Sequence, residues 1–430
     1  MIWAAQETSA THYQVCCSLY SLKTHIVSPS LRALQMKRLV QNINNLTDLS
    51  TMAIKLLLTG LVRRPIFKNS LFPRWITKAD SVEKERKLVG YWLVGVGALT
   101  ATTVSLGGIT RLTKSGLSMV DWHPFNELPP RNQLQWEHEF EKYKQYPEFK
   151  LRNSEISLQD FKWIWYMEYI HRTFGRLIGL SFFVPAAYFG YKGYFKGRVK
   201  YVIPALGGLI LFQGGLGWYM VKSGLEEKPK DYSEPRVSHL RLAAHLGTAF
   251  LFFSTTALTA MHHLMPPEKL VKTVELFKFK RCAYGLTGAV FTTALSGALV
   301  AGMEAGLTYN SWPMMADRWI PTDLLAKTPL WINFIHNSTT VQFDHRWLGQ
   351  LTFLATTFTW LYSRRLPLPP RLKAASNLLM LLATFQLSLG VSTLLLYVPK
   401  HLAATHQAGA LALLSSSLWL THQLKMVRRI

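Results

Sequence analysis

Cysteine is nearly absent from this chain, with only Cys16, Cys17 and Cys282 among 430 residues. So few thiols exclude a disulfide-rich secreted scaffold and any zinc site made of cysteine alone. Charged residues are also scarce, at 17% against the roughly 25% of typical soluble domains. The chain is nevertheless 49% apolar, which excludes intrinsic disorder.

Acidic residues are the scarcest charged group, because 24 acids face 48 bases and the formal net charge is +24. In a soluble protein such an excess is typical of nucleic-acid binding. In a membrane protein the same excess marks the loops that stay on the inner side of the bilayer. The positions of the bases along the chain therefore distinguish a nucleic-acid-binding surface from a membrane-topology signal.

Long uncharged runs predict eight transmembrane helices. A bilayer core needs about 20 mostly apolar residues per helix, and six runs meet this with at most one histidine. Two further segments begin with ionisable residues and become apolar in their second halves. The predicted fold is an all-α polytopic membrane protein with spans at 88–110, 163–189, 202–221, 242–261, 282–303, 341–362, 377–398 and 402–420.

Loop charge alternates along these spans. The connections after the second and sixth spans contain bases and no acid, whereas the loop 111–162 holds eight bases and eight acids. Every even-numbered connection is basic and every odd-numbered one is near neutral, which is the positive-inside pattern. Both termini are therefore expected on the positive side, and nucleic acid is not an expected partner.

Residues 1–85 form a separate zone of composition. Between Ser9 and Ala79 the one acid, Asp48, is set against ten bases, as in a mitochondrial presequence. A disordered basic arm is the alternative. A presequence would make the positive side the mitochondrial matrix and the membrane the inner one.

The two halves of the membrane region repeat each other. The motif Gly116-Leu117-Ser118 matches Gly306-Leu307-Thr308, and His171-Arg172 matches His345-Arg346. Since four spans is an even number, both copies have one orientation and form two pseudo-symmetric four-helix bundles, a parallel repeat. The predicted divisions are the arm 1–85, a bundle at 86–265, a basic linker at 266–281 and a bundle at 282–430.

Four histidines recur at matched places: His171 and His245 in the first half, His345 and His406 in the second. Each begins an even-numbered span, so the two of a half lie at similar depth near the face away from the matrix. Paired imidazoles on facing helices are the arrangement that bis-histidine haem iron requires. A hydrogen-bonded interfacial role suits one such histidine better than four in register.

Several neighbours of these histidines fit a bound macrocycle. Gly175, Gly179 and Gly349 follow the histidines at helical spacing and either admit a flat ring or serve close helix packing. Arg172 and Arg346 adjoin the histidines where haem propionates would emerge, or else face lipid headgroups. Two glutamines, Gln213 and Gln386, are expected to bond across helices rather than to a ring.

The halves differ three residues before the first histidine of each. Glu168 precedes His171, whereas Gln342 precedes His345. A carboxylate on the histidine's helix face could act as an acid, a base or a stabiliser of positive charge. It could instead orient its histidine or pair with Arg172.

With these motifs, residues 85–425 resemble the haem A synthase family in its mitochondrial branch. The resemblance implies oxidation of the C8 methyl of haem O to a formyl group, giving haem A for cytochrome c oxidase. It implies haem b, with Arg346 beside it, on His345 and His406 in the C-terminal bundle. It also implies substrate haem near His171, His245 and Arg172, with Glu168 as the catalytic residue.

The same resemblance implies ferredoxin and ferredoxin reductase as the electron source and haem O synthase as a further partner. The expected location is the mitochondrial inner membrane, with both termini in the matrix and the haem ligands near the intermembrane-space side. A cysteine pair found in an odd-numbered loop of some bacterial relatives has no counterpart here. Two alternatives remain: a non-enzymatic di-haem cytochrome and a metal or ion transporter built on the repeat.

Overall fold

The structure, a computed structural model, describes residues 71–123, 127–226, 236–271 and 273–427. The chain divides into two compact units, Met1–Thr77 and Lys78–Ile430, and the fold described here belongs to the second. Most of the predicted presequence therefore lies outside the described residues. Apart from an isolated bridge between Met315 and Arg318, the regular structure within the described ranges is helical.

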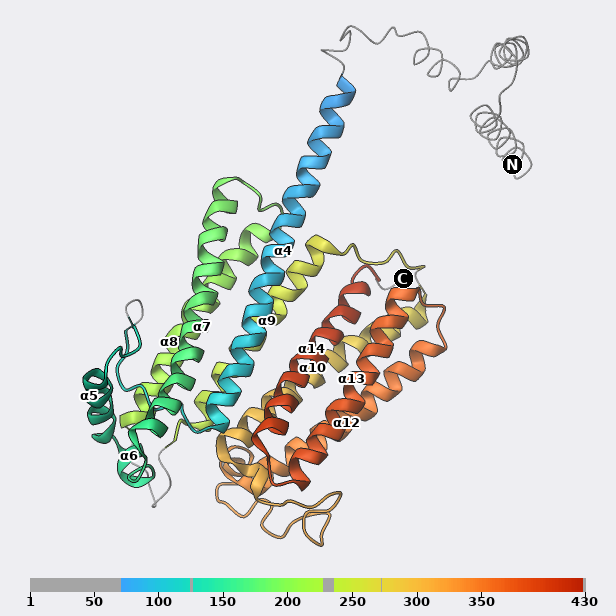
Figure 1. The fold of residues 1–430 in the computed structure, drawn as a ribbon. Coiled ribbons are helices and arrows are strands. Elements are labelled where there is room, and N and C mark those ends of the chain that lie inside the picture. Colours follow the sequence, from blue (N-terminus) through green and yellow to red (C-terminus); the bar gives the residue numbers. More distant parts are fainter. Residues whose placement is uncertain (1–70, 124–126, 227–235, 272, 428–430) are drawn as a thin grey trace, which may run out of the picture. The chain divides into compact units, whose positions relative to one another are not determined.

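Eight long helices account for most of the described chain (Figure 1). They are α4 (Leu71–Leu112), α7 (Leu158–Tyr191), α8 (Val199–Glu226), α9 (His239–Leu264), α10 (Val274–Met303), α12 (Ser338–Arg364), α13 (Pro370–Leu395) and α14 (Lys400–Gln423). Each contains most of one predicted span, in the predicted order. The seventh helix ends early, at Leu395, because left-handed backbone at Tyr397 and Val398 leads into Pro399, which cannot continue a helix.

Five of these helices are long and apolar enough to cross a membrane: α4 from Asp80 onward, α8, α9, α10 and α13. The chain is therefore an all-α membrane protein. The helices α7, α12 and α14 are of comparable length but carry more polar and charged side chains, among them His171, His345 and His406. The count of eight spans remains a prediction.

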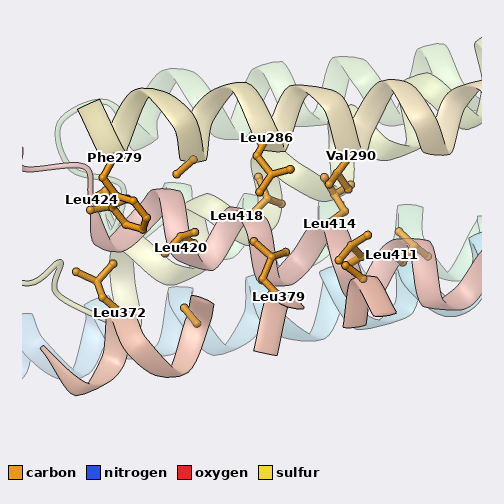
Figure 2. Packing of buried hydrophobic residues seen from close by; sticks show 14 of the residues in the cluster. Phe279, Leu286, Val290, Leu372, Leu379, Leu411, Leu414, Leu418, Leu420 and Leu424 are labelled. Carbon is orange, nitrogen blue, oxygen red and sulfur yellow. The ribbon is translucent and has the colours of Figure 1, made fainter. Parts of the chain in front are cut away.

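Two apolar clusters hold the helices together. One joins α4, α7, α8 and α9 through residues such as Leu93, Phe182, Leu206 and Phe252. The other is centred on α10, α13 and α14, whose leucines interlock along the helices, as Figure 2 shows. It also takes in Phe250 of α9, so burial of apolar surface continues from one half into the other.

The loops after α4 and α10 lie at the same end of the helices (Figure 1). The first carries two short helices that the apolar runs did not predict, α5 (Gln133–Lys144) and α6 (Pro147–Leu151). An aromatic cluster that includes Trp136, Tyr143 and Phe161 fixes α5 against the start of α7. The second loop contains the short helix α11 (Asn333–His336). The first loop is bonded to the N-terminal half of α7 and the second loop to the start of α12, so each lies against a helix that carries a histidine.

Candidate functional site

One cavity of about 1540 Å³ runs between the long helices of both halves. This volume exceeds the roughly 300–1,000 Å³ of a pocket for one small ligand. All the site residues expected from the sequence line it: Glu168, His171, Arg172, His245, His345, Arg346 and His406. The structure therefore brings together groups that are far apart in the chain.

The second-half histidines face each other across this cavity. The ring centroids of His345 and His406 are 6.4 Å apart and the ring planes are nearly perpendicular, at 87°. A metal bound to both rings through bonds of about 2 Å would hold the centroids roughly 6 Å apart. The pair thus fits haem iron ligated from both sides.

Hydrogen bonding of the imidazoles agrees with this fit. The Nδ1 atom of His345 is 2.7 Å from the Ser296 hydroxyl, which fixes the ring, as outer partners of metal-bound histidines do. The Nδ1 atoms of His171, His245 and His406 are buried and have no hydrogen-bond partner in the described part of the chain. These three rings therefore lack the fixing partner that Ser296 provides for His345, and their fit to a ligand rests on the cavity that they line.

Each of the four imidazoles packs against a glycine of a neighbouring helix. A Cβ atom added to any of these glycines would lie between 2.8 and 3.2 Å from the histidine Cε1. The lack of a side chain therefore lets the ring stand close to the neighbouring backbone. The pairs are Gly107 with His171, Gly217 with His245, Gly297 with His345 and Gly390 with His406.

Another set of glycines faces open space. Gly175, Gly179 and Gly349 line the cavity, and a Cβ added to each would meet nothing within 4 Å. They do not serve close helix packing, so the interpretation that they admit a flat ring is the one that fits.

The two glutamines bond across helices, as expected. Gln213 of α8 donates from Nε2 to the carbonyl oxygen of His245 at 2.8 Å, and Gln386 of α13 donates to that of His406 at 2.6 Å. Each glutamine thereby holds the helix turn that carries a histidine.

Glu168 is 2% exposed and surrounded by donors. Oε2 accepts from the Ser118 hydroxyl at 2.8 Å and from the backbone N–H of Met119 at 2.9 Å. Oε1 accepts from Nη2 of Arg172 at 2.6 Å and from its Nε at 3.1 Å. A carboxylate suits this set, because every one of these partners donates.

The arginine beside Glu168 is also fully engaged. Arg172 donates to the carbonyl oxygens of Met119 at 2.7 Å and Asp121 at 2.9 Å, and its guanidinium lies over the Trp122 ring. Of the expected alternatives for Glu168, pairing with Arg172 is therefore present. The contact of Arg172 with a propionate stays a prediction.

The second half has the same framework without the carboxylate. Gln342 donates to the carbonyl oxygen of Tyr309 at 3.0 Å, and Arg346 donates to the same oxygen at 2.7 Å. Tyr309 follows the second copy of the loop motif, as Met119 follows the first. One half of the cavity therefore carries a buried negative charge where the other carries a neutral amide.

Comparison with known proteins agrees with this site. A family model described as cytochrome oxidase assembly protein, COX15-CtaA, matches residues 90–418. The chain belongs to the COX15-CtaA family. It is 54% identical over 342 residues to heme A synthase COX15 of Bos taurus, and the matched region covers 79% of this chain and 83% of that relative. Heme A synthase COX15 of Arabidopsis thaliana is 46% identical, over 79% of this chain and 75% of that relative. Heme A synthase of Nitrosospira multiformis is 42% identical, over 81% of this chain and 96% of that relative.

Several residues of this COX15-CtaA site were not predicted from the sequence. Ser118 and the Met119 N–H hold Glu168, and Ser296 holds His345. Aligning the repeat would have paired Gly107 with Gly297, since both precede the matched Gly-Leu motifs by the same spacing. The sequence alone contained no sign that these glycines meet the imidazoles.

Proposed function

We propose that this protein is a haem A synthase, which oxidises the C8 methyl of haem O to a formyl group by two successive two-electron oxidations. The observation that carries the proposal is the asymmetry of the cavity. It holds two histidine pairs, and the buried side chain three residues before the first histidine is the carboxyl group of Glu168 in one half and the amide of Gln342 in the other. Relatives named heme A synthase cover most of the chain at 40–54% identity. The product would be haem A for cytochrome c oxidase.

The C-terminal half would hold haem b. His345 and His406 would ligate its iron, and Arg346 lies beside them on the cavity wall. Such a haem supplies one-electron transfer, which side chains cannot provide. Ser296 orients one ligand and Gln386 holds the turn of the other.

The N-terminal half would hold the substrate between His171 and His245, with Arg172 next to them. Glu168 would stabilise positive charge that develops on the substrate, since its donors fix it as a negative group. Arg172 and the Ser118–Met119 turn hold the carboxylate in place before the reaction, so little reorganisation is needed during it.

The cellular setting completes the proposal. Eight spans in two parallel four-helix bundles would place both termini in the mitochondrial matrix and the four histidines toward the intermembrane space. Ferredoxin and its reductase would supply electrons at the inner membrane, and haem O synthase would supply the substrate. The length of all eight helices and the acid-poor stretch from Ser9 to Ala79 support this setting.

Pigment extraction from cells that lack the protein tests the function. We expect haem O to accumulate and haem A to disappear, and the wild-type chain to reverse both changes. Unchanged haem A would instead support a di-haem cytochrome that only transfers electrons. A purified protein that contains no haem and binds a bare metal ion would support a transporter.

A further inference from the structure

A second buried carboxyl group faces the cavity and has no part in the proposed chemistry. Glu148 belongs to the short helix α6 in the loop between α4 and α7, and it is 3% exposed. It lines the same cavity as Glu168 and His171. A carboxyl group is rarely buried at this depth without a strong partner.

The partners of Glu148 are weaker than those of Glu168. Its Oε2 accepts one hydrogen bond, from the Tyr143 hydroxyl at 3.1 Å, and the nearest cation atom is Nη1 of Arg152 at 4.0 Å. Tyr143 in turn accepts from Nδ2 of Asn153 at 2.7 Å. Within the described part of the chain, Glu148 thus has no close charged donor of the kind that Arg172 provides for Glu168. This environment also suits the protonated acid.

The charged groups that act on Glu148 belong to α4, to α7 and to the end of α6. Burial raises the pKa of Glu148 to about 7, and repulsion from Glu168 adds to this effect. The Tyr143 hydrogen bond and the positive charges of Arg152 and Arg111 act in the opposite direction. A group with a pKa near neutral pH gains and loses protons with similar ease.

We propose that Glu148 exchanges protons between the cavity beside Glu168 and the water outside the loop. The inference rests on the proposed function, because converting a methyl to a formyl group breaks C–H bonds and protons must cross the cavity boundary. In the step itself Glu148 takes up one proton on one side of this boundary as the carboxylate, becomes the neutral acid and releases the same proton on the other side. No electron moves through Glu148 in this step.

Infrared titration of the purified full-length protein tests the protonation directly. We expect the carbonyl band of a protonated carboxyl group to disappear with a midpoint of about 7. The band should be absent from Glu148→Gln and present in the control Glu155→Gln, which alters an exposed carboxyl of the same loop. Tyr143→Phe should move the midpoint to higher pH, because it removes a hydrogen bond that favours the carboxylate.

The rate of haem A formation from haem O tests the function of this proton. Glu148→Gln should lower the rate by about tenfold, less than the loss expected for a group acting directly on the reacting atoms. It should also remove the pH dependence near neutrality and leave the haem b spectrum intact. In Tyr143→Phe the pH dependence should shift upward together with the infrared midpoint, which a purely structural role would not cause.

Each failure has a distinct meaning. If wild-type protein forms haem A and Glu148→Gln matches it at every pH, the inference is wrong and the proposed function stands. An infrared midpoint near that of an ordinary glutamate would also overturn the inference. If wild-type protein forms no haem A, the proposed function is wrong and the inference falls with it. If Glu148→Gln fails to fold, Tyr143→Phe tests the inference instead. The infrared midpoint and the pH dependence of the rate must then both shift to higher pH, and the absence of either shift would overturn the inference.

Discussion

At the scale of single residues, the difference between the halves is the exchange of a carboxylate for an amide. Glu168 accepts hydrogen bonds from Ser118, Met119 and Arg172, whereas Gln342 donates one to the Tyr309 carbonyl. Both side chains hold the loop above them, so an amide suffices for that structural role. The charge of Glu168 is then the feature that packing does not explain.

The buried pair of Glu168 and Arg172 gives the first prediction at this scale. Both side chains are less than a tenth exposed, so Arg172→Met leaves a buried carboxylate without its cation. We expect this variant to lose about 3–5 kcal/mol of stability, measured by thermal unfolding in detergent.

The double variant Arg172→Met with Glu168→Gln should recover part of that loss, because the unpaired charge is then gone. Arg346→Met provides the matched control, since its guanidinium bonds to backbone carbonyls without a carboxylate partner among the described contacts. A double variant no more stable than Arg172→Met alone would contradict the ion-pair account.

At the scale of elements, the sequence predicted eight helices and the histidines that four of them carry. Hydrophobic length and the repeat contain this information, since apolar runs and matched motifs are visible without coordinates. The helices α5 and α6 were not predicted, because aromatic contacts such as Tyr143 with Phe161, not an apolar run, hold that loop. The burial of Glu148 was hidden for the same reason.

At this scale the glycines show most clearly which contacts could not be predicted from the sequence. The cavity-facing Gly175 and Gly349 could be inferred from their spacing after a histidine. The glycines that touch the imidazoles lie on other helices, so their role depends on which helices become neighbours. Helix pairing is a tertiary property that local spacing does not contain.

Helix packing at Gly297 gives the second prediction. Gly297→Leu places a side chain where a Cβ alone would lie 3.2 Å from the His345 ring. We expect the ring to be displaced and the absorbance of low-spin haem b in the purified protein to be lost or strongly reduced.

The matched control is Gly288→Leu, on the same helix, where a Cβ meets nothing within 4 Å. This variant should keep the haem b spectrum. A normal spectrum in Gly297→Leu would show that the contact between Gly297 and His345 does not set the ligand position.

At the scale of the whole molecule, the two halves meet through polar contacts close to both sites. Gln407, next to His406, donates to the Val104 carbonyl of α4 at 2.9 Å and packs on Gly108. Gly108 adjoins Gly107, which touches His171. At the end of the helices Arg111 donates to the Gly302 carbonyl at 2.8 Å, and Lys114 pairs with Glu304 at 3.1 Å. The helix α4 is therefore bonded to both α10 and α14 of the other half.

The central claim is that one half holds a permanent haem while the other converts its substrate beside Glu168. The most direct measurement is the type of haem extracted from purified wild-type protein and from Glu168→Gln. We predict haem b in equal amount from both, with haem A present in the wild type and replaced by haem O in the variant. Equal amounts of haem A from the two proteins, or loss of haem b from the variant, would contradict the account.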